Sequence, residues 1–454
     1  MPKTTLPIED PPPARAADLD GMLLAIDRLP VHARDLAAAW TLITDAVGCV
    51  LGAAATPAAR PALAWSAEQP QGPVPLAWTL GALSNILELD AMHVGSSVHP
   101  GTVVVPAALA LALVLDSPAE ALARAVLRGT EAAIRIGCST GATHRRHFQS
   151  TSTCAGAGAA LACADLLGLQ EDAKLDAMGN ALSTAGGLWA FVDEETMTKQ
   201  WHAGHAAQNG LACAQLAAHG LRGPRQVLGS RRGFHAVLCA DAVPGELVRD
   251  PPGWQIHATA YKPWPCPRPV HAAITAALAL RQRIGRADSI RSIDLRTFAM
   301  AVDLCHCAMP TTAHEARFSL QYCVAAALQD GAVDFDTFDA GAIARHRDLA
   351  GRVVVHADTA MTRDYPLQSR AALELVLDDG QVVAQDTRHA LGDPEQPLDA
   401  ACRQAKHAAL VRLLPQAGRQ PATAALRAAS AGQAGSLAAI RLALRACGVP
   451  PSLP

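Results

Sequence analysis

The sequence has little charge and few aromatic residues. Charged residues make up 17% of its 454 positions and aromatic residues 4%, whereas 50% of the residues are hydrophobic. A chain of this composition can bury a core and is not disordered, and its many alanines favour closely packed helices. The formal net charge of −3 gives no electrostatic footprint for nucleic acid. We therefore expect a globular protein of two or three domains that binds no nucleic acid.

The sequence also has little that would direct the chain to a membrane. Residues 1–20 are polar and proline-rich, without the apolar stretch of a secretory signal. The apolar run at residues 103–115 is interrupted by Pro106 and is too short to cross a bilayer. We expect a cytoplasmic protein that binds no membrane, with a flexible segment at residues 1–20.

Paired cysteines are missing. None of the twelve cysteines forms a Cys-x-x-Cys pair, and most stand singly in apolar sequence, as buried thiols do in cytosolic proteins. Cys305-His306-Cys307 resembles a ligand cluster, but adjacent ligands cannot close a tetrahedral site alone. An iron–sulfur dehydratase is disfavoured because its cluster needs thiolates at recognisable spacing. We expect no metal and no cofactor.

Helical periodicity dominates both ends of the chain. Residues 30–222 are mostly amphipathic or apolar helix, including a small-residue helix at 153–167 that Gly168 would end. We place the helical domain that contains them at residues 21–265. Residues 399–454 are helical again. We predict a mostly α fold in which both ends form one large helical domain.

The pattern changes between residues 266 and 398. Alternating residues predict strands, and Asp378-Asp379-Gly380 predicts a hairpin turn. The segments are strands at 290–298, 351–356, 373–377 and 381–385, and a helix at 314–328. We predict that residues 266–398 form a smaller α+β domain.

Lysine is scarce as well. Only five of the 38 basic residues are lysines, so arginine supplies the positive charge wherever charge is enough. Arginine cannot release its proton near neutral pH, whereas lysine can be tuned to act as an acid or base. Lys199 and Lys262 lie in poorly periodic segments rich in Gly, His or Pro. Composition alone favours a chemical role and a solvated surface position equally.

Residues 87–101 gather carboxylates and imidazoles. Glu88, Asp90, His93 and His99 lie within twelve positions, ahead of a Pro-Gly break and an apolar helix. Such groups are the usual ones in proton transfer, and imidazole titrates nearest to neutral pH. The alternatives are a helix cap for Asp90 and a buried, hydrogen-bonded role for His93. A metal site from these four side chains is also open, although a helical His-Glu-x-x-His spacing is missing.

Four segments carry longer and more specific patterns. They are residues 87–101, 197–210, 261–271 and 314–331. In this order they are similar to the sequence blocks of the MmgE/PrpD family, and the similarity runs from about residue 35 to 415. The resemblance implies a large helical domain made from both chain ends, a smaller α+β lid domain and usually a homodimer. It also implies catalysis between the domains without a metal or organic cofactor.

The resemblance further implies site residues. His99, Lys199 and Lys262 fall on positions that bear active-site residues in relatives, and Asp90 and Tyr322 fall at or near such positions. We expect His99 to be the general acid or base, oriented by Asp90 or Glu88, with Lys262 or Tyr322 on the opposite face of the substrate. For substrate contact we expect Glu88, His93, His202, Arg268 and Thr153.

Three positions depart from the family pattern. Relatives often carry aspartate at the position of Glu88 and a hydroxyl residue near Met92, and many have a histidine at the position of Gln149. Glutamine cannot exchange a proton at neutral pH, which argues against a simple copy of the relatives' reaction. His144 or His147 is a candidate substitute.

The family contains 2-methylcitrate dehydratases, cis-aconitate decarboxylases and an iminodisuccinate epimerase. We therefore expect a cofactor-independent lyase of a small di- or tricarboxylate, a dehydratase of the 2-methylcitrate type first. Decarboxylation, epimerisation of an amino- or imino-dicarboxylate, and a scaffold with an eroded site are the alternatives. We also expect Lys199, Lys262 and His99 to share one cleft, where burial and like charge would depress a lysine pKa.

Overall fold

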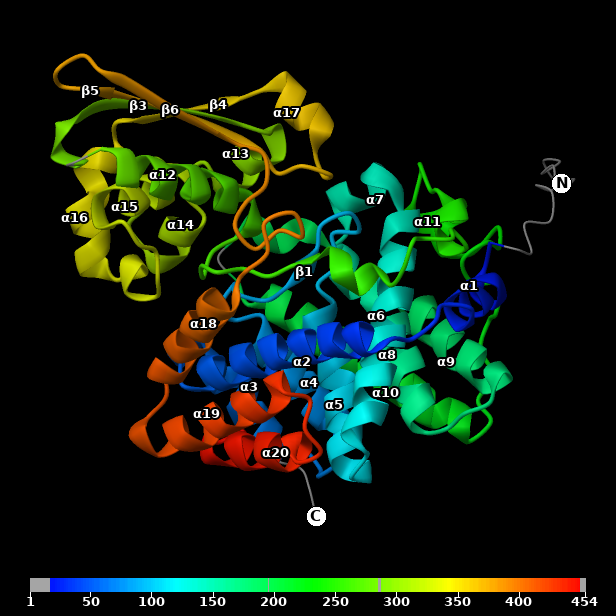
Figure 1. The fold of residues 1–454 in the computed structure, drawn as a ribbon. Helices are drawn as coiled ribbons and strands as arrows, with labels where there is room; N and C mark the ends of the chain where they lie inside the picture. The colour runs from blue at the N-terminus through cyan, green and yellow to red at the C-terminus, as the bar shows by residue number, and fades with distance from the viewer. Residues whose placement is uncertain (1–16, 195, 285–286, 450–454) are drawn as a thin grey trace, which may run out of the picture.

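The computed structural model describes residues 17–194, 196–284 and 287–449 (Figure 1). Helices dominate and the sheets are small, which confirms the mostly α fold. Residues 1–16 of the predicted flexible segment lie outside the described residues. Helix α1 begins at Leu19, which is fully buried, so the last two residues of that predicted segment belong to a helix.

The first half of the chain is a set of packed helices. Helix α8 lies among α5, α6, α9 and α10, and glycines bring its backbone close to its neighbours. A Cβ on Gly158 would meet the carbonyl oxygen of Gly129 in α6, and one on Gly210 in α10 would meet that of Gly156. The helices are α1 (Leu19–Asp27), α2 (Ala33–Ala54), α3 (Arg60–Glu68), α4 (Pro73–Ser84), α5 (Val104–Leu115), α6 (Ala119–Ser139), α7 (Gly141–His147), α8 (Ser150–Leu166), α9 (Glu171–Ser183), α10 (Thr198–Ala218) and α11 (Phe234–Leu238).

The next part of the chain carries a four-stranded sheet covered by helices. The strand order is β4-β3-β5-β6, with β3 and β4 parallel and the other neighbours antiparallel, and α12 packs on β5 and β6. The four predicted strands are therefore confirmed. The elements are α12 (His271–Arg283), β3 (Ile290–Thr297), α13 (Ala299–Cys305), α14 (Ala313–Arg317), α15 (Leu320–Asp330), α16 (Ala340–Ala350), β4 (Val353–Ala357), α17 (Thr359–Asp364), β5 (Ala371–Leu377) and β6 (Val382–Thr387).

The predicted helix at 314–328 is two helices rather than one. The chain leaves α14 at Phe318 and restarts α15 after Ser319. The Ser319 side chain accepts a hydrogen bond from the Tyr322 backbone N–H at 2.9 Å, as an N-cap residue does.

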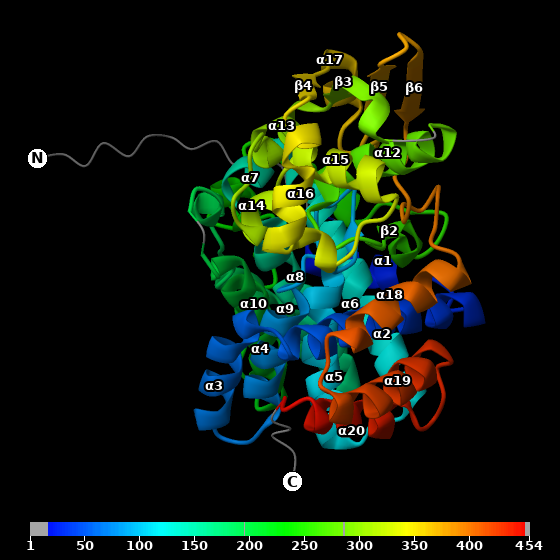
Figure 2. The same cartoon turned by 90° about the vertical axis from the view of Figure 1, so that its left-hand side faces the viewer.

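The C-terminal helices return to the first half of the chain. They are α18 (Ala400–Arg412), α19 (Gln416–Ser430) and α20 (Ser436–Ala446), and all three pack against α2. Figure 2 shows these orange and red helices beside the blue α2, away from the sheet. Buried hydrophobic side chains form two clusters, one drawn mainly from residues 19–256 and 410–449 and one from residues 264–390. The domain limits at 265 and 398 stay a prediction.

Helix α2 is long and apolar enough to cross a membrane by length and composition alone. The sequence-based expectation considered only residues 103–115 and overlooked it. In the structure 78% of its apolar window is buried, as in the core helix of a globular fold.

A short ribbon joins two distant segments beneath the sheet region. Strand β1 (Met92–His93) pairs antiparallel with β2 (Thr259–Ala260), with Met92 opposite Ala260 and His93 opposite Thr259. This pairing places the residues just before Met92 beside those just after Ala260.

Candidate active site

The β1–β2 pairing assembles the site. Asp90 lies two residues before Met92, and Lys262 lies two residues after Ala260. A bridge between His93 and Val98 then turns the chain back and places His99 at the same point. Pairing at one ribbon therefore collects a carboxylate, an ammonium and an imidazole.

Residues Leu87–Asp90 form what we call the carboxylate loop. The side chains of Glu88 and Asp90 are both buried, and Glu88 has a φ of 53°, in the left-handed region that non-glycine residues rarely adopt. The backbone oxygens of the loop are held, because Lys262 Nζ donates to Glu88 O at 3.0 Å and Lys406 Nζ donates to Leu89 O at 2.8 Å. The loop thus presents two carboxylates in one fixed conformation.

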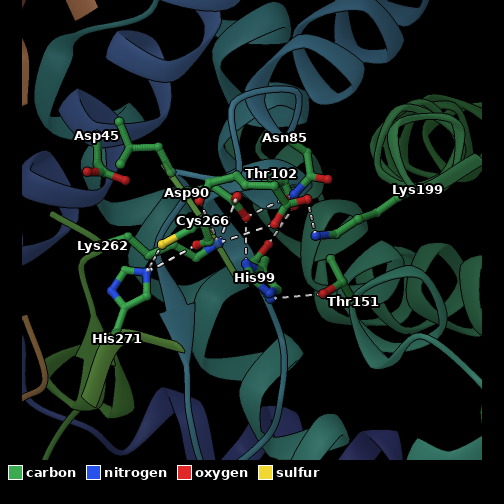
Figure 3. A network of polar contacts seen from close by, with 12 residues as sticks. Asp45, Asn85, Asp90, His99, Thr102, Thr151, Lys199, Lys262, Cys266 and His271 are labelled. Carbon is green, nitrogen blue, oxygen red and sulfur yellow. Dashed lines mark hydrogen bonds and ion pairs between the residues drawn. The ribbon is translucent and has the colours of Figure 1, made fainter. Parts of the chain in front are cut away.

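Two lysines meet these carboxylates, one from helix α10 and one from the segment that follows strand β2. Lys199, in the first turn of α10, places Nζ 2.5 Å from Glu88 Oε1. Lys262 places Nζ 3.6 Å from Glu88 Oε2 and 3.5 Å from Asp90 Oδ1. Figure 3 shows the two side chains entering from opposite sides, with Asp90 and His99 between them.

His99 is held by its ring and its backbone. Its Nδ1 lies 2.5 Å from Asp90 Oδ2, and the same oxygen accepts a hydrogen bond from Asn85 Nδ2 at 3.0 Å. Its backbone N–H donates to Thr151 Oγ1 in the first turn of α8 at 3.1 Å. Of the two carboxylates that the sequence offered, Asp90 is therefore the one that orients the imidazole. Nε2 has no hydrogen bond to any residue that the structure describes, so it is the ring nitrogen free for chemistry.

The site keeps one open edge. The side chains of Lys199 and His99 are 16% and 13% exposed, whereas those of Lys262 and Asp90 are almost completely buried. Lys199 and His99 are therefore the two residues of this cluster that are in part accessible from solvent.

The charges of the site determine each other's protonation. Burial alone would raise the pKa values of Glu88 and Asp90, but nearby cationic groups hold both below the usual range. For Glu88 these groups are Lys199 and Lys262, and for Asp90 they are Lys262 and His99. Burial would lower the pKa of Lys262, but Asp90 and Glu88 outweigh it and raise this pKa. The expected depression of a lysine pKa is therefore wrong for Lys262, because opposite rather than like charges are its nearest neighbours.

Two further polar groups that the sequence reading did not single out lie near this cluster. Burial lowers the pKa of Arg317 while the charge of Glu88 opposes the shift, and Arg317 Nε is buried without a hydrogen bond to any described residue. The hydroxyl of Tyr365, from the sheet region, interacts with Ser97, and burial raises its pKa. Arg317 had a signal, because it stands inside the sequence block at 314–331; Tyr365 had none.

Tyr322 is not part of the cluster. Its side chain is fully buried in the second hydrophobic cluster, where the hydroxyl donates to Thr337 O and lies 3.1 Å from His346 Nδ1. The expectation that Tyr322 serves as a second acid or base is therefore corrected. Its hydroxyl makes its polar contacts within the core of the sheet region.

Three of the residues expected to bind substrate have structural partners instead. Nδ1 of His93 lies 2.9 Å from Ser96 Oγ, and burial lowers the His93 pKa to about 4, so this ring stays neutral and supports the turn before His99. Thr153 Oγ1 is buried and lies 2.8 Å from His144 Nε2. Arg268 is buried in an ion pair with Asp393, and burial lowers its pKa to about 10. His93 and Thr153 are therefore not free to contact substrate in this arrangement, which corrects those two expectations. Arg268 Nη1 is buried without a hydrogen bond to any described residue, so substrate contact by Arg268 stays a prediction.

Gln149 contacts a residue of the expected site. Its Oε1 lies 2.9 Å from Nδ1 of His202, whose pKa is lowered by burial, so the Nδ1–H of a neutral ring donates to the amide. Neither of the two histidines that were candidates to replace a histidine at position 149 lies beside Gln149 in the contacts that the structure describes. His144 bonds Thr153 and Leu238 O, and His147 is exposed on α7.

A metal fits the site poorly. Both carboxylates of the loop already face ammonium groups, and His93 is bonded to Ser96. Within the described residues, His389, Asp393 and Glu395 could bring ligand atoms within 4.8 Å of one another. Asp393 there is paired with Arg268 and accepts the Ala390 N–H at 2.8 Å, which competes with a cation.

Comparison with known proteins matches two family models in sequence order. The MmgE/PrpD N-terminal domain matches residues 23–246, and the MmgE/PrpD C-terminal domain matches residues 264–429. The cis-aconitate decarboxylases of Mus musculus and Homo sapiens are 32% identical over 203 residues and 33% identical over 202 residues. Each of these alignments covers 42% of this chain and 41% of the relative. The Aspergillus terreus cis-aconitate decarboxylase is 34% identical over 167 residues, 35% of this chain and 34% of the relative. The chain is thus aligned with less than half the length of these curated relatives.

Proposed function

The chain belongs to the MmgE/PrpD family, and we propose that it is a lyase that acts on a small tricarboxylate without a metal or organic cofactor. One observation carries the proposal: the Asp90–His99 pair lies beside two ammonium groups at the open edge of a buried cluster. Such a site can move a proton at a carbon atom and offset negative charge that develops on the carboxylates next to it.

We favour decarboxylation of a cis-aconitate-like substrate, because the matched relatives are cis-aconitate decarboxylases. In this reaction the bond between a carbon atom and one carboxylate breaks, and carbon dioxide leaves. The electron pair moves toward a remaining carboxylate, where Lys199 and Lys262 offset the growing charge. Protonated Nε2 of His99 then supplies a proton to carbon.

Dehydration of a hydroxylated tricarboxylate, such as 2-methylcitrate, is the second candidate. It is favoured by the free Nε2 of His99, which can accept a proton from a carbon next to a carboxylate while Asp90 orients the ring. The leaving hydroxyl takes a proton from an ammonium group, and Lys199 is the more exposed of the two. Lys199 and Arg317 are our first candidates for binding the substrate carboxylates, ahead of Arg268, which is paired with Asp393.

The decisive experiment follows substrates in deuterated water. The protein is incubated separately with cis-aconitate, 2-methylcitrate, citrate and iminodisuccinate, and the products are analysed by mass spectrometry and proton NMR. Loss of 43 mass units, which is loss of carbon dioxide with one deuteron taken up on carbon, identifies decarboxylation, and loss of 18 identifies dehydration. Exchange of one proton without loss of mass identifies epimerisation, which would replace the lyase proposal. No change with any substrate would leave only the scaffold alternative.

Assembly and location stay predictions. We propose a homodimer in the cytoplasm, as the family resemblance implies. Light scattering coupled to size-exclusion chromatography should give twice the chain mass of 47.2 kDa. A monomer at micromolar concentration would contradict the dimer.

A further inference from the structure

Lys406 is a buried lysine that the mechanism above does not use. It lies in α18, in the part of the chain that returns to the first helices, and is 5% exposed. Its Nζ lies 2.5 Å from Asp45 Oδ1 of α2 and donates to Leu89 O at 2.8 Å. The sequence offered no sign of this role, because Lys406 stands in ordinary helical sequence 361 positions from Asp45.

The carbonyl that Lys406 binds belongs to the carboxylate loop. Leu89 O lies between the two functional carboxylates, and the preceding carbonyl, Glu88 O, accepts from Lys262. Two ammonium groups from distant parts of the chain therefore hold two consecutive carbonyls. Glu88 adopts a φ of 53°, a conformation that persists only where its surroundings hold it.

The Asp45–Lys406 pair is suited to hold the loop rather than to react. In the described residues, neither side chain is paired with the carboxylate of Glu88 or Asp90. Lys406 therefore acts on the reacting groups only through its hydrogen bond to the backbone of the loop. A buried lysine is tolerated when a carboxylate and further acceptors satisfy it, and Asp45 and Leu89 O provide them.

We propose that Lys406 is a positioning residue: by binding Leu89 O it holds the carboxylate loop in the conformation in which Asp90 meets His99 and Glu88 meets Lys199. This role rests on the proposed function for its effect on turnover, but its effect on the loop does not depend on any substrate. It makes α18 part of the support of the active site.

The test compares Lys406→Met with Lys174→Met. Lys174 forms a similar pair, with Nζ 2.7 Å from Asp165 Oδ1, but on α9 and without a bond to the loop. For Lys406→Met we expect kcat to fall roughly 10- to 100-fold with KM within a few-fold, because misplacement of reacting groups by about 1 Å has such effects. Amide hydrogen exchange should rise at least about tenfold in the peptide that covers residues 86–92 and stay unchanged in α8. Lys174→Met should change neither measurement.

Rescue separates positioning from general stability. Lys406→Arg keeps the charge beside Asp45 and a donor for Leu89 O, so it should recover most of the lost kcat and slow the exchange again. A folded Lys406→Met protein with unchanged kcat and unchanged exchange at residues 86–92 would overturn the proposal. So would exchange that rises equally in all helices.

Two further outcomes are decisive. If Lys406→Met does not fold, Lys406→Gln, which is polar but shorter than lysine and uncharged, should fold and show raised exchange at residues 86–92. Failure of both to fold would assign Lys406 to the stability of the whole fold and overturn the positioning role. If the wild-type protein turns over none of the four substrates, the proposed function fails, and the exchange measurement alone decides the role of Lys406.

Discussion

Of the histidine–aspartate pairs in the described residues, two lie in different regions and have buried imidazoles, and only one of these two has the surroundings of an active site. In the first, Nδ1 of His99 lies 2.5 Å from Asp90, beside the ammonium groups and near an open edge. In the second, Nε2 of His346 lies 2.9 Å from Asp330 while Nδ1 lies 3.1 Å from the Tyr322 hydroxyl. Both nitrogens of the second ring are occupied, and the ring is fully buried. A histidine–aspartate pair can serve in catalysis only where one ring nitrogen stays free and nearby cations can offset negative charge on the substrate.

The largest effect should come from breaking the first pair. His99→Gln keeps a side chain that can bond Asp90 but cannot transfer a proton, so kcat should fall by about 10³-fold. The matched change His346→Gln should leave kcat within a few-fold and lower the thermal midpoint instead. Steady-state kinetics and thermal unfolding on both variants check this. Equal losses of kcat in the two variants would remove the distinction between the regions.

The lysines of the first region give the next largest effect. Lys199→Arg keeps the charge beside Glu88 but changes the shape of the donor and cannot release a proton. If Lys199 delivers a proton, kcat should fall by about 10²-fold. An increase confined to KM would reduce its role to carboxylate binding. Lys174→Arg serves as the control.

Buried imidazoles near and away from the site should share a pH effect on stability. Burial lowers the folded-state pKa of His93 from 6.5 to about 4, and the same holds for His235 beside Ser139. Below about pH 6.5 these imidazoles bind protons in the unfolded chain but stay neutral in the folded chain. The free energy of unfolding therefore falls as the pH drops from 6.5 toward 4. His93→Gln should remove roughly 2 kcal/mol of this loss between pH 7 and pH 4.5, measured by urea denaturation. His235→Gln should behave alike, and an unchanged pH dependence in either variant would contradict the argument.

The smallest effect should follow removal of metal. Because the carboxylates of the site face lysines, dialysis against EDTA should leave turnover within experimental error. The group of His389, Asp393 and Glu395 lies apart from the Asp90–His99 pair in sequence and supplies no ligand to it. Loss of activity that one added metal restores would reject the cofactor-free proposal.

Local patterns in the sequence predicted much of this protein. Alternation of apolar residues marked the four strands of the sheet, and helical periodicity marked both ends of the chain. The scarcity of lysine drew attention to Lys199 and Lys262, which the structure brings together with His99 around Glu88 and Asp90. Composition and spacing report local preferences well because they act within one element.

The failures lie where a residue's role depends on a distant partner. Thr153 has a hydroxyl that could bind a carboxylate, but that hydroxyl lies 2.8 Å from His144 Nε2. Tyr322 belongs to a recognisable block, yet its helix turns the hydroxyl into the core. The sequence around Lys406 contains no pattern that indicates its role. A short stretch of sequence does not indicate which of these side chains will be in contact in the folded protein.

The sequence by itself determined which chemical groups are available and which helices and strands carry them. Only the tertiary structure decided that Asp90 rather than Glu88 orients His99, and that the pKa of Lys262 rises rather than falls. The reason is electrostatic and geometric. Burial penalises a charge in every case, but the sign of the net shift depends on which opposite charges lie within a few ångströms. Those neighbours come from α2, α10, the β1–β2 ribbon and α18, segments that meet only when the chain is folded.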